Sequence, residues 1–132
     1  MPTPFLFAGT VCALLSVAFG AFGAHGLKHL VTPEMLEVFK TGVTYQMWHA
    51  LALILVALLQ QLTPSNALLT WAGRLFFAGI IVFSGSLYLL VLLDQKWLGI
   101  ITPLGGLAFL AGWTCLCVFA RKTLPPLDLK HF

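Results

Sequence analysis

The stretch GVTYQMWHALALILVALLQQL, residues 42–62, contains no Asp, Glu, Lys or Arg and is as long as a membrane-spanning helix. A helix needs about 20 apolar residues to cross the hydrocarbon core of a bilayer. Since 60% of the 132 residues are hydrophobic and 8% are charged, a small water-soluble domain could not bury them in its core. The sequence therefore predicts an all-α integral membrane protein, with residues 1–132 forming a single domain.

Three further runs of similar length, at 4–24, 75–93 and 102–120, contain no charged residue and predict three further spans. The four transmembrane helices are expected over about residues 4–24, 42–62, 70–93 and 102–120. An alternative for the first run is a cleavable signal peptide, because Ala21-Phe22-Gly23 loosely resembles a cleavage site. The segment before Phe5 has no Lys or Arg, however, and the apolar stretch is longer than the core of most signal peptides. We therefore expect this run to be a span.

Threonine followed by proline separates the apolar segments. Threonine can cap the start of a helix and proline fits its first turn, so each pair predicts a helix start. The pairs are Thr32-Pro33, Thr63-Pro64 and Thr102-Pro103. The first pair opens a segment with Glu34 near its start, Lys40 near its end and Gly42 after it. This order suits the helix dipole, and we expect a short interfacial amphipathic helix over residues 33–41, between the first and second spans.

The basic residues indicate topology. The net charge is +3, but the Lys and Arg residues are scattered, which argues against binding of nucleic acid. An even number of spans places both termini on one side of the membrane. That side carries Arg74, Arg121, Lys122 and Lys130, whereas the other carries Lys28, Lys40 and Lys96. The excess of one charge favours cytoplasmic termini in the bacterial cytoplasmic (inner) membrane.

Glycines within the predicted spans indicate close helix contacts. Small residues let two helices approach closely in lipid, where packing replaces the hydrophobic driving force. The expected close-packing positions are Gly20, Gly23, Gly85, Gly105 and Gly106.

Polar side chains gather at one level of the predicted bundle. His49 lies seven residues beyond Gly42, about 10 Å deep at the helical rise, and Tyr45 lies one turn above it. With four spans, the other polar groups near this depth fall in the same leaflet, away from the termini. The candidate ligand-binding residues are His25, Tyr45, His49, Ser84, Tyr88 and Thr102.

Several of these residues have a structural alternative. Ser84 and Ser86 point to nearly opposite sides of a helix, so one pocket takes one of them; we favour Ser84 with Tyr88. The alternative for either serine is a hydrogen bond to a carbonyl of its own helix. His49 is costly at its depth and needs a partner, which is either a neighbouring helix or a ligand.

Metal, cofactor and catalytic sites have little support. His25 and His29 are four residues apart, but Gly26 lies between them and the spacing fixes no third metal ligand. Cys115 and Cys117 point to different sides of a helix, so we expect no metal and no cofactor. A hydrolase built from His49, Ser84 and Asp94 would lack a nucleophile-elbow sequence.

Four segments resemble the signature segments of a known family. They are GAFGAHG at 20–26, TGVTYQMWHALAL at 41–53, FSGSLYLL at 83–90 and ITPLGGLAFLAGW at 101–113. They resemble the YgdD/YwdK-like family of small, uncharacterised inner-membrane proteins (domain of unknown function 423), which is similar to eukaryotic transmembrane protein 256. The resemblance implies four helices in the bacterial cytoplasmic membrane and implies no reaction or substrate.

The leading hypothesis is a non-enzymatic binding or accessory protein. A polar pocket in the outer leaflet would hold a small ligand, a lipid headgroup or a partner subunit. We expect membrane lipid as a partner, and either a homo-oligomer or a place in a larger membrane complex, because glycine-bearing spans offer packing surface. A small-solute transporter and a membrane-embedded enzyme are the alternatives, and the spans contain no carboxylate for ion coupling.

Overall fold

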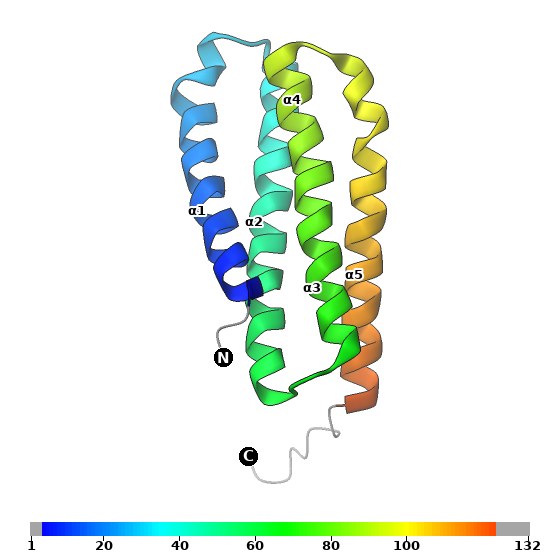
Figure 1. Cartoon of the computed structure of the whole chain (residues 1–132). Coiled ribbons are helices and arrows are strands. Elements are labelled where there is room, and N and C mark those ends of the chain that lie inside the picture. Colours follow the sequence, from blue (N-terminus) through cyan, green and yellow to red (C-terminus); the bar gives the residue numbers. More distant parts are fainter. Residues whose placement is uncertain (1–3, 124–132) are drawn as a thin grey trace, which may run out of the picture.

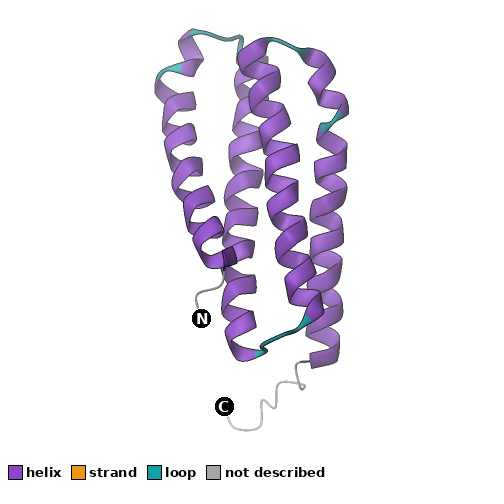
Figure 2. Cartoon of the chain, in the orientation of Figure 1, coloured by secondary structure: helices purple, strands orange, loops and turns teal. Residues whose placement is uncertain are grey.

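The fold is described by a computed structural model that covers residues 4–123, and it is helical along nearly all of this length (Figure 2). Five α-helices are joined by short 3₁₀ segments, η1 and η3, and by a π-helical segment, η2. Their bounds are α1 Pro4–His25, η1 Leu27–His29, α2 Pro33–Leu62, α3 Ala67–Gly79, η2 Ile80–Ser84, α4 Gly85–Leu93, η3 Lys96–Ile100 and α5 Thr102–Thr123.

The chain forms four spans, as the uncharged runs predict. The helical stretches Pro4–His29, Pro33–Leu62, Ala67–Leu93 and Lys96–Thr123 are each long and apolar enough to cross a membrane. The third span consists of α3, η2 and α4, which follow one another without a break. The start of α1, the end of α5 and the α2–α3 turn lie at one end of the bundle, and η1 and η3 lie at the other (Figure 1).

The four spans do not pack equally. Helix α1 packs mainly against α2, whereas α3 packs mainly against α5, and α2 connects the two pairs through its contacts with α3 and α4. In Figure 1, α1 stands at one side of the bundle and α5 at the other. Of the four spans, α1 buries the smallest share of its residues. Helix α1 is therefore the least enclosed wall of the bundle.

The expected separate helix over residues 33–41 does not form, because this segment is the beginning of α2. Thr32 caps it as predicted, since its side chain accepts a hydrogen bond from the Met35 N–H at 3.2 Å. Gly42 is buried inside the continuous helix rather than ending it. A Cβ on Gly42 would lie 2.8 Å from the Tyr88 ring, so this glycine allows α4 to approach α2 closely.

Thr63-Pro64 does not start a helix, which corrects the second of the three expected starts. Thr63 follows the end of α2, and its N–H bonds to the Leu59 carbonyl. The cap of α3 is Asn66, whose side-chain oxygen accepts from the N–H groups of Leu68 and Leu69. An asparagine oxygen satisfies these helix-terminal donors as well as a threonine hydroxyl does.

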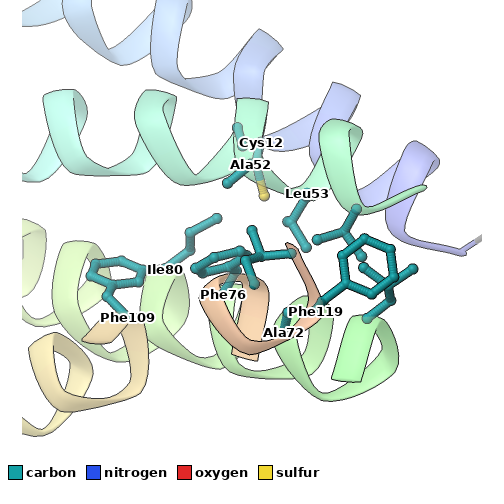
Figure 3. Packing of buried hydrophobic residues seen from close by; sticks show 12 residues of the cluster. Cys12, Ala52, Leu53, Ala72, Phe76, Ile80, Phe109 and Phe119 are labelled. Carbon is teal, nitrogen blue, oxygen red and sulfur yellow. The ribbon is translucent and has the colours of Figure 1, made fainter. Parts of the chain in front are cut away.

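A core of aromatic and aliphatic side chains fills the space between α2, α3 and α5. Phe76 from α3 and Phe119 from α5 are almost completely buried, together with Leu53 from α2. Figure 3 shows these side chains converging, with Cys12 of α1 and Ile80 of η2 at the edge of the cluster. This core fixes α2, α3 and α5 relative to one another.

The five expected close-packing glycines differ in their surroundings. At Gly105 a Cβ would lie 2.6 Å from Phe83 Cβ and 2.7 Å from its Cα, and at Gly23 it would lie 3.2 Å from the Phe39 ring. At Gly20 and Gly106 the nearest atoms are 3.6 and 3.9 Å away. Gly85 departs from the expectation, because a Cβ there would meet nothing within 4 Å.

The adjacent pair Gly105 and Gly106 provides a matched test of this packing. We expect Gly105→Ala to lower the free energy of unfolding by about 1–3 kcal/mol, because the new methyl group overlaps the backbone of η2. Gly106→Ala should leave stability unchanged or raise it by up to about 1 kcal/mol, since alanine favours a helix more than glycine does. Denaturant titration in mixed micelles measures both values, and equal values for the two variants would contradict this packing.

Candidate functional site

A groove runs between α1 and α4 along the side where α1 is least enclosed. Its deep part has a volume of about 550 Å³ and is lined from Cys12, Leu15 and Phe19 of α1 across to η2, α4 and η3. A small hollow of about 100 Å³ shares Phe19 and Tyr88 with the deep part. It shares Leu92 with an outer hollow of about 410 Å³ that reaches Asp94. These three hollows lie next to one another along α4 and share lining residues; together we call them the α1–α4 groove, and we call the outermost one its mouth.

The wall of the deep part is almost wholly apolar and carries one buried polar bridge. Gln46 of α2 is 4% exposed, and its amide nitrogen donates to the Cys12 carbonyl at 2.8 Å. Its amide oxygen accepts from the Tyr88 hydroxyl at 2.7 Å. One side chain of α2 therefore bonds to α1 on one side and to α4 on the other. The bridge crosses the floor of the groove, which both Gln46 and Tyr88 line.

The two serines each bond to a different neighbouring helix. Ser84 is completely buried and donates to the Gly42 carbonyl of α2 at 2.7 Å. Ser86 lines the groove and donates to the Phe83 carbonyl at 2.8 Å, and its oxygen lies 2.6 Å from the Thr102 hydroxyl. Because Ser86 has a single proton, Thr102 is the donor in that pair. Ser84 is the last residue of the π-helical segment η2, and Ser86 lies two residues beyond it.

His49 is enclosed on the other side of α2, against α3 and α5. Its Nδ1 lies 2.7 Å from the Tyr45 carbonyl, and its Nε2 lies 3.0 Å from the Trp113 indole nitrogen. A carbonyl only accepts and an indole N–H only donates, so both contacts require the neutral tautomer with the proton on Nδ1. The ring stacks on Phe109 with centroids 3.5 Å apart. Both ring nitrogens are thus bonded within the protein.

The six candidate residues do not meet in one pocket. Tyr88 lines the groove, and Thr102 touches it through Ser86. Ser84 is buried against α2, while Tyr45 and His49 stack in the aromatic cluster around Phe109. His25 is exposed at the end of α1 and is not part of the groove lining. Ligand binding by these residues remains a prediction.

Sequence analysis missed Gln46 and the site role of Asp94. Gln46 is four residues from Gly42 and three from His49, so the helical spacing already placed it near a buried face. An uncharged amide attracted less attention than the titratable His49, although an unpaired amide in lipid is costly as well. Asp94 was considered only as part of a hydrolase, and its place at the mouth of a groove depends on how η1, α2 and α4 are arranged.

The groups that line the groove determine what it can hold. Within residues 4–123, no three His, Cys, Asp or Glu side chains are grouped as metal ligands would be. The polar side chains Gln46, Ser86 and Tyr88 of the deep part bond to other side chains or to backbone. A long apolar channel with few polar groups matches the usual form of a small-molecule pocket.

The Gln46 bridge gives a second test. We expect Gln46→Leu to lower the free energy of unfolding by about 1–2 kcal/mol, because the buried Tyr88 hydroxyl loses its acceptor. Adding Tyr88→Phe should recover part of the loss, so the double variant is less destabilised than the sum of the single ones. Gln60→Leu is the control, since its amide makes only a 3.4 Å contact with Thr70 near the end of the bundle. Strictly additive effects in a double-mutant cycle would refute the bridge.

Comparisons with known proteins agree on the class of this chain. The family model described as a protein of unknown function (DUF423) matches residues 19–106. The UPF0382 membrane protein YwdK of Bacillus subtilis is 48% identical over 91% of this chain and 98% of its own length. UPF0382 membrane proteins of Staphylococcus aureus and Staphylococcus haemolyticus are 47% and 45% identical, each over 89% of this chain and 95% of the relative.

No solved structure matches the chain. The predicted family is confirmed, and so is the prediction of a multi-pass membrane protein. The chain belongs to the DUF423 family of membrane proteins, whose function is unknown.

Proposed function

We propose that the protein is a non-enzymatic binding protein for a membrane amphiphile. The apolar chain of the ligand lies in the deep part of the α1–α4 groove, and its headgroup lies at the mouth, at the end of the bundle away from the termini. Of the three ligand classes expected from the sequence, a lipid fits the groove best. The observation that carries this proposal is the almost wholly apolar deep part of the groove, together with a more polar mouth along the same helix that includes Asp94.

The size and lining of the groove support a lipid-like ligand. The deep part, at about 550 Å³, falls in the range of about 300–1,000 Å³ typical of small-molecule pockets. Its hydrogen-bonding groups, Gln46 and Ser86, already have partners in the protein. An apolar chain occupies such a channel without leaving buried polar groups unpaired, whereas a polar solute would have to compete with existing hydrogen bonds.

The groove is open toward the lipid. Leu15, Ile81 and Leu89 line its deep part and are 40%, 59% and 48% exposed. All three lie within membrane-spanning segments, where an exposed side chain faces acyl chains. A ligand dissolved in the bilayer therefore enters sideways between α1 and α4 and needs no passage through water.

Transport and catalysis have less support. The deep part of the groove is lined by no Asp, Glu, Lys, Arg or His, so ion coupling through these groups has no site there. No acid, base and nucleophile converge along it, as a reaction would require. Docking of a second copy or of a larger complex on the same face competes with lipid and is a further outcome of the test below.

Gly85 allows the groove to be filled without disturbing the helices. It lines the deep part, and a Cβ placed on it meets nothing within 4 Å. We expect Gly85→Leu to reduce the amount of co-purified lipid at least threefold, because the new side chain occupies the channel. The unfolding free energy should not fall, since leucine favours helix by up to about 1 kcal/mol relative to glycine.

Native mass spectrometry of the protein in mild detergent measures the bound lipid. Gly85→Ala is the matched control and should retain lipid, because a methyl group removes little of the volume. If Gly85→Leu keeps the wild-type lipid content, the proposal is wrong. Cross-linking in intact membranes tests for a protein in the groove. If the wild type cross-links to a second protein chain there and Gly85→Leu does not, a protein occupies the groove and the lipid proposal is also wrong.

A further inference from the structure

We infer that the mouth of the groove selects a phospholipid with a primary ammonium headgroup, and that Asp94 is the residue that recognises it. This inference rests on the proposed lipid binding and adds the chemical class of the ligand. It comes from three features of Asp94 and its surroundings: its place in the lining of the mouth, its left-handed backbone and the carbonyl groups at the end of the helix before it.

Asp94 is the one charged residue that lines the mouth. The mouth, of about 410 Å³, lies between the η1 region and the end of α4, and Leu27, Met35, Val91 and Leu92 form apolar parts of its wall. Helix α4 ends at Leu93, so Asp94 stands where the hydrocarbon region gives way to headgroups. A lipid whose chain follows the groove inward would present its headgroup at this level.

The backbone position of Asp94 suits glycine or asparagine better than aspartate. Its φ and ψ of 52° and 41° lie in the left-handed region, where glycine and asparagine are preferred. Its negative charge also stands at the C-terminus of α4, where the helix dipole disfavours anions. Both effects lower stability, and neither would arise with glycine at this position. A residue that lowers local stability in two ways is expected where its side chain binds a ligand.

The carboxylate is free to pair with a ligand. Among residues 4–123 the one side-chain ion pair joins Lys40 and Glu37, so Asp94 has no cationic partner there. Lys28 on η1 and Lys96 on η3 flank this end of the bundle. Their charges would repel a lone cation but suit a headgroup that carries a phosphate next to its ammonium group. A zwitterionic phospholipid satisfies both signs of charge.

The end of α4 distinguishes a primary ammonium from a quaternary one. The N–H groups of Asp94 and Gln95 both bond to the Leu90 carbonyl. The carbonyls of Val91, Leu92 and Leu93 therefore receive no hydrogen bond from the two residues that follow the helix. A primary ammonium group has three N–H donors for these carbonyls and for the carboxylate, whereas a quaternary ammonium has none. The mouth thus favours phosphatidylethanolamine over phosphatidylcholine.

The test uses lipid exchange on the full-length protein in nanodiscs. The discs contain equal amounts of phosphatidylethanolamine, phosphatidylcholine and phosphatidylglycerol with identical acyl chains, and native mass spectrometry counts the lipids that remain bound. We expect the wild type to retain phosphatidylethanolamine over phosphatidylcholine by roughly three- to tenfold, the range for one charge-assisted contact at a partly exposed site. Asp94→Asn should bring this ratio close to one.

The same variant should raise the unfolding temperature, because asparagine suits the left-handed backbone and removes the negative charge from the helix end. A gain in stability with a loss of selectivity separates recognition from a merely structural role. Glu37→Gln is the control, since it removes a carboxylate at the same end of the bundle but outside the groove, and it should keep the wild-type ratio.

The outcomes distinguish this inference from the proposal beneath it. If Gly85→Leu removes lipid but Asp94→Asn leaves the ratio unchanged, the groove binds lipid and the headgroup inference is wrong. Preferential retention of phosphatidylglycerol by the wild type would overturn it too, because the lysines would then dominate recognition. If Gly85→Leu leaves the lipid content intact, the proposed function itself fails.

Discussion

A polar atom inside the hydrocarbon of a bilayer must find its partner within the protein, and this constraint determines how the four spans are held together. Gln46 meets it by bonding to α1 and α4 at once, and Ser84 meets it by bonding across to the Gly42 carbonyl. His49 does the same between Tyr45 and Trp113. Through these contacts, α2 is bonded to each of the other three spans. Three of the predicted ligand-binding residues, His49, Ser84 and Tyr88, therefore form hydrogen bonds between helices.

The groove follows from an imbalance in this packing. Large aromatic side chains hold α2, α3 and α5 together, whereas α1 has few contacts beyond α2. Small residues on α1 bring the two helices close; a Cβ on Gly9 would lie 2.9 Å from the Ala50 carbonyl oxygen. Close contact with one neighbour leaves the opposite face of α1 without a partner, and the space beside α4 remains. In water such a space would be an exposed apolar patch, whereas in a bilayer it faces acyl chains.

The sequence was sufficient for the spans because charge and length decide them, and the four family-like segments were sufficient for the family. It was not sufficient for the site. Depth along a helix follows from the residue count, so Tyr45, His49 and Tyr88 were placed at the right level, but rotation about each axis decides which neighbour they meet. Trp113 was never paired with His49, since nothing in the order of residues tells which face of α5 turns inward. The helix end expected at Gly42 was wrong for a related reason. A glycine ends some helices, whereas in others it allows a second helix to approach closely.

The π-helical turn at η2 changes the phase of the third span. A helix that carries one additional residue turns everything beyond it by about 100° relative to everything before it. The face of α3 that meets α5 is therefore not continued by the same face of α4, and Tyr88 comes to face Gln46 of α2 instead. The third span thus packs against α5 through α3, and it lines the groove through η2 and α4. A homologue without the additional residue would have the same hydropathy profile, but its α4 side chains would point in different directions.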